Sequence, residues 1–194
     1  MAMINRLGPA TIVAGLAVTG VLVSTLVDFG HSDFRKIAQF EIPHARQAIA
    51  VNNDFLFGID DAAVGKYDKK TGVLVASWSA PAESHVQHLN SGIILDEKLL
   101  AAHSNYPDFP IENSIESWSP ESLEHVGTRK ISGRYGYAVW VDWHGRSWWV
   151  AFAHYEKTRP MTGFGSEKTT LVRFDDDWNE LDSWVYPSTL IDRM

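Results

Sequence analysis

The stretch His88–Ile131, HLNSGIILDEKLLAAHSNYPDFPIENSIESWSPESLEHVGTRKI, decides the fold of this chain. It reads as an apolar strand, a tight turn, a more apolar strand, a long loop, an aromatic-bearing strand, a polar turn and an alternating strand. Short apolar or alternating runs that are bounded by turn residues are typical of strands in an antiparallel sheet. The stretch therefore predicts one sheet of four strands.

The same pattern occurs three times between residues 45 and 187. The first copy is ARQAIAVNN, DFLFGIDD, AAVGKYDKKTG and VLVASWS, and the third is YAVWVDWHGR, SWWVAFAHYE, TTLVRFDDDW and NELDSWVYP. Third-strand aromatics Tyr67, Trp118 and Phe174 recur at roughly 50 residues, which is a blade-like period. An antiparallel sandwich is the alternative, but it need not repeat the same order of loops and aromatics. The sequence predicts an all-β fold, a partial β-propeller of about three four-stranded blades.

Three blades do not close a ring, because closed propellers use about four to eight. The alternating segment Phe34–Ile42 has no blade of its own, so we expect it to be an N-terminal clasp strand that completes the last blade. The chain stops at Met194, soon after the outer strand of the third blade. We therefore expect residues 31–194 to be propeller blades that are incomplete at the C-terminus, or a partial propeller. A partial propeller would self-associate with a second copy through its open blade edge.

An uncharged apolar run, Ala10–Val27, precedes the blades. Its length is close to the roughly 20 residues that cross the hydrocarbon core of a membrane. No convincing Ala-x-Ala cleavage site follows, which favours a signal anchor within residues 1–30 over a cleaved signal peptide. A buried helix of a soluble domain fits less well, because no polar face interrupts the run. We expect a single-pass cell-membrane protein with an exported domain, or a secreted or periplasmic protein if the segment is cleaved.

Charge and composition exclude several classes of function. Lys and Arg number 17 against 24 Asp and Glu, for a net charge of −7, so no basic surface is expected to bind nucleic acid. The chain has no cysteine, which excludes disulfides, Cys-based zinc sites and a thiol nucleophile. The absence of cysteine does not fix the compartment.

Polar side chains replace apolar ones where the second strands end and where one blade connects to the next. In propeller connectivity these loops lie on one face near the central channel, where ligands bind. We expect acid–base groups at His88, His103 and His154. The remaining candidates are substrate-binding residues at Arg46, Asp60, Asn105, Arg134, Tyr135 and Glu156.

Each candidate also has a purely structural interpretation. The histidines suit acid–base chemistry near neutral pH or a divalent metal ion such as zinc, because an unperturbed imidazole titrates near 6.5. They could equally be strand-end residues that backbone groups satisfy. No tight spacing such as His-x-x-x-His marks a metal site, so the metal stays undetermined. Arg46 and Arg134 could clamp a carboxylate or form ordinary surface ion pairs.

Four segments carry a resemblance to a known group of proteins: His88–Gly92, Ala102–Pro107, Trp149–Tyr155 and Thr170–Asp175. They resemble bacterial propellers of the quinoprotein-dehydrogenase-like superfamily that are labelled cycloisomerases, and more distantly the carboxymuconate-lactonising and lactonase propellers. The likeness covers residues 34–187, and the chain lacks the remaining blades of a complete member. The resemblance implies an isomerase or lactonase-like enzyme that acts on a small carboxylate or lactone at the channel mouth. The alternative is a non-catalytic scaffold whose loops bind a protein or a glycan.

Overall fold

The computed structural model of the chain describes residues 35–155 and 165–191, and the chain divides into two units, 1–37 and 38–194. The predicted hydrophobic segment, Phe34 and Glu156 lie outside the described residues. Within the described ranges, no helix combines the length and the apolar character that a membrane span requires. The anchor and the export that it implies therefore stay predictions.

All of the blades belong to the second unit, and each is an antiparallel sheet of four strands in chain order. The first contains β1 Ala48–Val51, β2 Phe55–Asp60, β3 Ala63–Asp68 and β4 Leu74–Ser79. The second contains β5 Leu89–Leu95, β6 Lys98–Ser104, β7 Asn113–Trp118 and β8 His125–Ile131. The third contains β9 Tyr137–His144, β10 Ser147–Ala153, β11 Thr170–Phe174 and β12 Glu180–Val185. Two short helices, η1 Ser166–Lys168 and α1 Ser188–Ile191, follow β10 and β12.

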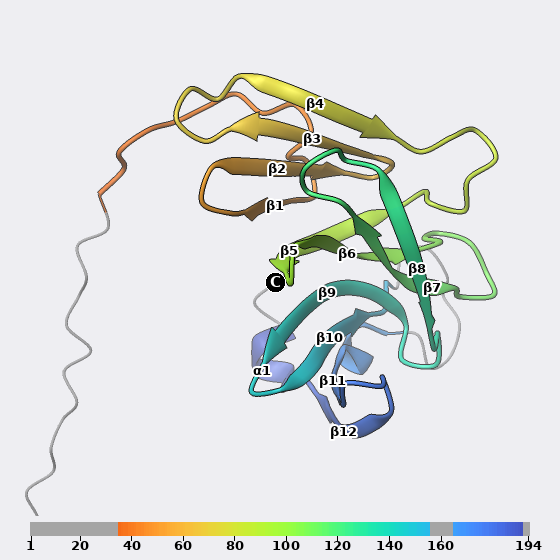
Figure 1. Ribbon diagram of the computed structural model, residues 1–194. Helices are drawn as coiled ribbons and strands as arrows, with labels where there is room; N and C mark the ends of the chain where they lie inside the picture. The colour runs from red at the N-terminus through yellow and green to blue at the C-terminus, as the bar shows by residue number, and fades with distance from the viewer. Residues whose placement is uncertain (1–34, 156–164, 192–194) are drawn as a thin grey trace, which may run out of the picture. The chain divides into compact units, whose positions relative to one another are not determined.

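The three sheets are arranged as blades. The first strands β1, β5 and β9 pack against one another in sequence, and the fourth strands β4, β8 and β12 lie on the outside (Figure 1). Each connection from a fourth strand runs to the first strand of the next sheet, as propeller connectivity requires. The predicted partial propeller of three four-stranded blades is confirmed.

The faces of the blades bury two apolar cores. Phe57 and Ile59 of blade 1 pack with Leu99 of blade 2 in one core, and Leu100 of blade 2 packs with Phe152 of blade 3 in the other. Neighbouring residues Leu99 and Leu100 enter different cores because successive side chains of a strand point to opposite faces. A central strand that is covered on both faces has to be apolar at every position, which explains the continuous apolar run of β6.

One buried amide joins blades 2 and 3 and fixes the loop between them. The Asn113 side-chain amide donates to the carbonyl of Gly136 at 2.8 Å and to that of Ser132 at 3.2 Å. Its oxygen accepts from the backbone N–H of Ala138 at 2.9 Å. The loop 132–136 is therefore held against the start of β9.

The clasp-strand prediction is wrong for the described residues 35–42, which form no strand. Residues 38–42 instead lie across the face of blade 1 that is turned away from blade 2. Gly58 and Gly65 pair across β2 and β3, and a Cβ on either would meet Ile42 or His44. Missing side chains at these positions leave a groove that the extended segment fills, and the His44 Nδ1 lies 2.5 Å from the Tyr67 hydroxyl. The segment thus covers the face of its own first blade.

Blade 3, the last of the three blades, carries an exposed aromatic face. Trp149 stacks on Trp184 with ring centroids 5.6 Å apart, and Trp140 and Trp184 are 38% and 46% exposed. These residues lie on the face of blade 3 that alternation turns away from blade 2. Self-association through an open blade edge stays a prediction.

A glycine pair tests the cover on blade 1. Gly72 and Gly145 both have positive φ values, +72° and +58°, but of the two only Gly72 has a neighbour, since a Cβ there would clash with the Phe40 ring. We expect Gly145→Ala to lower the free energy of unfolding by about 1–2 kcal/mol, the cost of a left-handed alanine. Gly72→Ala should cost more, because Phe40 must also move.

The control is Gly72→Ala in a Phe40→Ala background, where the extra cost should vanish. Urea unfolding of the wild type, the three single variants and the double variant measures these differences. Equal costs for Gly72→Ala with and without the Phe40 ring would show that the segment does not pack on the blade.

Candidate functional site

The polar candidates gather at one end of the blades, which we call the loop end. It carries the connections β2–β3, β6–β7 and β10–β11 and the interblade loops 80–88 and 132–136. In blade 1 the register places Asp60, the last residue of β2, opposite Ala63, the first residue of β3. In blade 2 it places Ser104 of β6 opposite Asn113 of β7 in the same way. The loops that follow the second strands therefore lie at the same end of each blade as the loops between blades, because each sheet has its strands in chain order.

A buried carboxylate lies in the face of blade 2 that packs toward blade 1. Glu116 of β7 is 0% exposed, and each of its oxygens accepts two hydrogen bonds. Oε1 accepts from Ser114 Oγ at 2.5 Å and lies 2.9 Å from His85 Nε2. Oε2 accepts from Thr128 Oγ1 at 2.6 Å and lies 2.7 Å from His125 Nε2. Burial alone would raise the pKa of Glu116, but these four partners outweigh it and lower the pKa.

His103 lies beside this carboxylate and is 2% exposed. The backbone N–H of Gln87 donates to its Nε2 at 3.3 Å, so in the neutral ring Nδ1 carries the proton and donates to Ser114 Oγ at 2.8 Å. Burial, with positive charge on His85 and His88, lowers the pKa of His103 from 6.5 to about 4 against the opposing attraction of Glu116. At neutral pH His103 is therefore an uncharged ring with both nitrogens engaged, which favours the structural interpretation of this residue.

His85 is the exposed member of the group. Its side chain is 51% exposed, and its ring meets that of His103 edge to face at 5.6 Å. Glu116 holds Nε2 in place, which fixes the tautomer with the proton on that nitrogen and leaves Nδ1 as a base. The ring lines a cavity of about 420 Å³ together with His103, Asn105, Ser114, Thr128 and Lys130. We call this space the histidine cavity.

Three predicted residues meet at the rim of the loop end, although none of them lines the histidine cavity. Asp61 accepts from Gln47 at 2.6 Å and lies 2.9 Å from His88 Nδ1. Arg46 reaches Asp60 at 3.4 Å and Asp61 at 3.8 Å. Arg46, Asp60 and His88 are therefore brought together, but the arginine is already neutralised by two carboxylates.

Aromatic rings extend this rim from blade 2 to blade 3. The Tyr106 ring lies 5.2 Å from His88, 5.3 Å from Tyr137 and 5.1 Å from Tyr155. His154, next to Tyr155, is nearly buried, and burial lowers the pKa of its imidazole. The three predicted histidines thus occupy the loop end, but of these three His103 alone lines the histidine cavity, and His154 lies on the third blade.

The other predicted binding residues have structural partners. Arg134 pairs with Glu180 of β12 and donates to the Tyr135 hydroxyl at 2.8 Å, which in turn donates to Glu180 at 2.6 Å. Asn105 closes its own loop, since its amide donates to Pro110 at 2.8 Å and accepts from the Glu112 N–H at 2.9 Å. Arg134 and Tyr135 are therefore held against the outer strand of blade 3 and away from His88.

Sequence reasoning missed the carboxylate that organises the site. Neither His85 of the interblade loop nor Glu116 of β7 is among the residues that the sequence predicts as candidates. A signal was present, because Ser114, Glu116 and Trp118 alternate on one face of a strand whose aromatic residue is buried. Two polar residues on that buried face required partners.

The described residues, 35–155 with 165–191, hold no group of three or more His, Asp or Glu side chains that could hold a metal ion. His85, His125 and Glu116 are close, but they are joined by hydrogen bonds at 2.7 Å and 2.9 Å.

Comparisons with known proteins give only distant similarities. No family model and no curated protein matches the chain. U3-55K is 12% identical over 72% of this chain and 39% of its own, with a TM-score of 0.47. A europium-containing methanol dehydrogenase is 10% identical over 71% of this chain and 31% of its own, with a TM-score of 0.46.

A protein of unknown function from Bacteroides caccae is 10% identical over 73% of this chain and 46% of its own, with a TM-score of 0.47. The chain spans less than half the length of each of these proteins. Similarities this distant indicate no substrate, cofactor or partner, and the resemblance to cycloisomerases is not confirmed beyond the propeller-like blades.

The lowered pKa of His103 predicts how stability depends on pH. The unfolded imidazole titrates near 6.5 and the folded one near 4, so the unfolded state binds more protons in that window. Stability is complete above the upper value and falls as the pH drops through the window, by about 2 kcal/mol at about pH 5. Burial of His154 acts in the same direction.

Urea midpoints at about pH 7.5 and pH 5 measure this loss. His103→Gln should lower stability at neutral pH but flatten the pH dependence, whereas His144→Gln, at the exposed end of β9, should keep the wild-type slope. An unchanged slope in His103→Gln would contradict the assignment.

Proposed function

We propose that this chain binds a small carboxylate or lactone in the histidine cavity and acts on it by acid–base catalysis. The observation that carries the proposal is the hydrogen bond from a partly exposed imidazole, His85, to a fully buried carboxylate, Glu116, at 2.9 Å. A buried carboxylate that orients a histidine is the arrangement by which many hydrolases hold a general base.

The surroundings of His85 support a small anionic or ester ligand. The cavity of about 420 Å³ is within the range of small-molecule sites. Lys130 of β8 provides positive charge at the wall, and the Ser114 and Thr128 side chains are both held by Glu116. His103 stays neutral beside them, so Lys130 supplies the positive charge that attracts a carboxylate.

The chemistry can be written for a lactone. His85 Nδ1 takes a proton from a water molecule as the water oxygen bonds to the lactone carbonyl carbon. The ring carbon–oxygen bond then breaks, and the departing ring oxygen receives the proton from His85. The product is an open hydroxy acid, which releases its carboxyl proton to solvent at neutral pH, and the resulting carboxylate faces Lys130. Glu116 keeps the imidazole in one orientation through both proton transfers.

His85→Gln tests the proposal. With δ-valerolactone as the probe, hydrolysis by the whole chain should exceed the buffer rate and should fall about 100-fold or more in His85→Gln, the usual share of a general base. Alkali uptake at constant pH measures the rate. His144→Gln is the matched control and should keep the wild-type rate.

Two measurements separate chemistry from folding. The melting temperature of His85→Gln should stay close to that of the wild type, because half of that side chain is already in solvent. Hydrolysis no faster than buffer, with no change in melting temperature on adding δ-valerolactone or 5-hydroxyvalerate, would overturn the proposal. That result would favour the non-catalytic scaffold that binds a protein or a glycan.

A further inference from the structure

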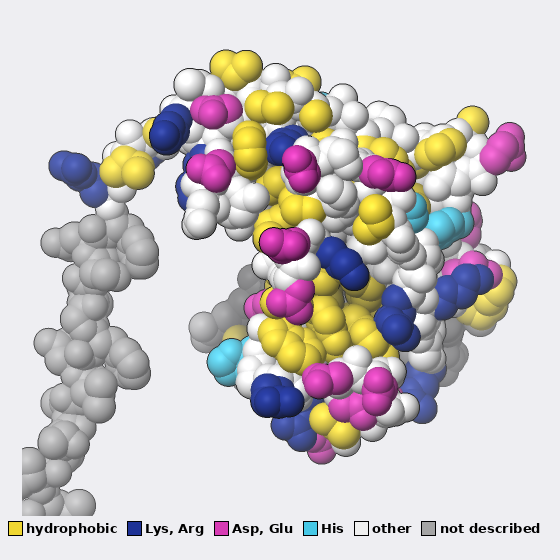
Figure 2. Space-filling model, viewed as in Figure 1, with side chains coloured by type: hydrophobic (Ala, Val, Ile, Leu, Met, Phe, Trp, Pro, Cys, Tyr) yellow, Lys and Arg dark blue, Asp and Glu magenta, His cyan; other side chains and the backbone are white. Residues whose placement is uncertain are grey.

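A second cavity, of about 430 Å³, lies between blades 2 and 3 at the end opposite the loop end. Its lining comes from the β5–β6 turn, β6, β7, β8, the start of β10 and the β11–β12 turn. In the middle of Figure 2, hydrophobic side chains lie recessed between basic and acidic ones. Only Thr128 of β8 is shared with the histidine cavity. We call this second space the tryptophan cleft.

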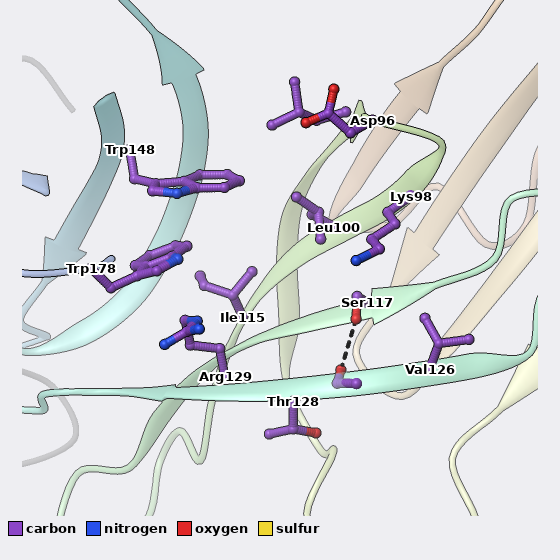
Figure 3. A pocket seen from close by; sticks show the side chains of 12 residues that line it. Asp96, Lys98, Leu100, Ile115, Ser117, Val126, Thr128, Arg129, Trp148 and Trp178 are labelled. Atoms are coloured by element: carbon purple, nitrogen blue, oxygen red, sulfur yellow. Dashed lines mark hydrogen bonds between the residues drawn. The ribbon is translucent and has the colours of Figure 1, made fainter. Parts of the chain in front are cut away.

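The walls of the tryptophan cleft are apolar and preformed. Leu100 and Ile115 contribute from blade 2, and Trp148 and Trp178 from blade 3. The two indoles stack with centroids 4.6 Å apart and an angle of 20°, and Trp143 meets Trp148 edge to face at 4.8 Å. Figure 3 shows both stacked indoles directed toward the aliphatic wall of blade 2. A rigid aromatic wall opposite an aliphatic one suits a flat apolar ring.

Two basic side chains border this apolar space. The Lys98 side chain extends into the cleft, and the Arg129 guanidinium lies beside Trp178, 5.8 Å from its ring (Figure 3). In the part of the chain that the structure describes, neither forms an ion pair with a carboxylate within 4.0 Å. Asp96 also lines the cleft, from the turn before β6. The cleft therefore presents two unneutralised cations beside an apolar surface, with one carboxylate at its edge.

We propose that the tryptophan cleft binds a small amphipathic anion, a flat apolar ring that carries one carboxylate. The ring lies between the indoles and the Leu100 wall, and the carboxylate pairs with Lys98 and Arg129. Both basic residues are exposed, so a carboxylate gains two charged partners at the border of the cleft, whereas a neutral ring gains none and a cationic ring is repelled. Asp96 disfavours a second negative charge at that edge. This site does not depend on the function proposed for the histidine cavity.

Isothermal titration with 2-naphthoate tests the site, with 2-naphthamide as the neutral ring of the same shape. The whole chain should bind the anion, and Lys98→Met should weaken that binding about tenfold while leaving the amide unaffected. Methionine keeps the apolar stem and removes only the charge. Lys70→Met, on an exposed turn of blade 1, is the matched control and should bind like the wild type.

A second variant tests where the ligand binds, because it blocks the entrance of the tryptophan cleft. Val126 lines the cleft and is 51% exposed, so Val126→Trp should fill the entrance and abolish binding of both ligands while the melting temperature stays within a few degrees of wild type. No binding of 2-naphthoate by the wild type, or binding that survives Lys98→Met and Val126→Trp, would overturn the proposal. Loss of binding in His85→Gln instead would place the ligand in the histidine cavity and would equally overturn it.

Discussion

Each blade is a sheet that has to cover both of its faces, and this constraint organises the whole unit. A sheet face that is rich in apolar side chains is stable only when another element removes it from water. Blade 2 satisfies the constraint twice, since Leu99 packs toward blade 1 and Leu100 toward blade 3. Blade 1 uses blade 2 on one side and its own preceding segment on the other, where Gly58 and Gly65 make room for Ile42 and His44.

The same packing creates the chemistry of the candidate site. Because the face between blades 1 and 2 is dry, a carboxylate there must receive hydrogen bonds at both oxygens. Glu116 receives four, and three of the donors, His85, Ser114 and Thr128, line the histidine cavity. Of its two histidine donors, His85 is the more exposed, at 51% against 27% for His125, while His103 remains inside. The requirement to satisfy one buried charge thus selects which imidazole can act as a base.

Imperfect packing creates the second cavity. Blades 2 and 3 are joined through their inner strands β5, β6 and β9, whereas residues of β8 and of the β11–β12 turn line the cavity between these blades. Trp148 and Trp178 fill part of this space by stacking on each other. The rest remains as a cleft that Lys98 and Arg129 border. The two cavities lie on opposite faces of blade 2 and meet only at Thr128.

The sequence by itself determined the number, order and approximate limits of the strands, because alternation and turn residues are local properties that repeat three times along the chain. It also placed His88, Asp60 and Arg46 at one end, because blade connectivity fixes which loops share an end. Only the tertiary structure decided that residues 38–42 lie on a sheet face instead of pairing as a strand. It also decided that Arg134 pairs with Glu180 and that Glu116 selects His85 over His103. Those outcomes depend on burial and on partners as many as 46 residues apart in the chain. Burial at a single position and long-range pairing produce no repeating pattern in the sequence, so the sequence alone does not predict them.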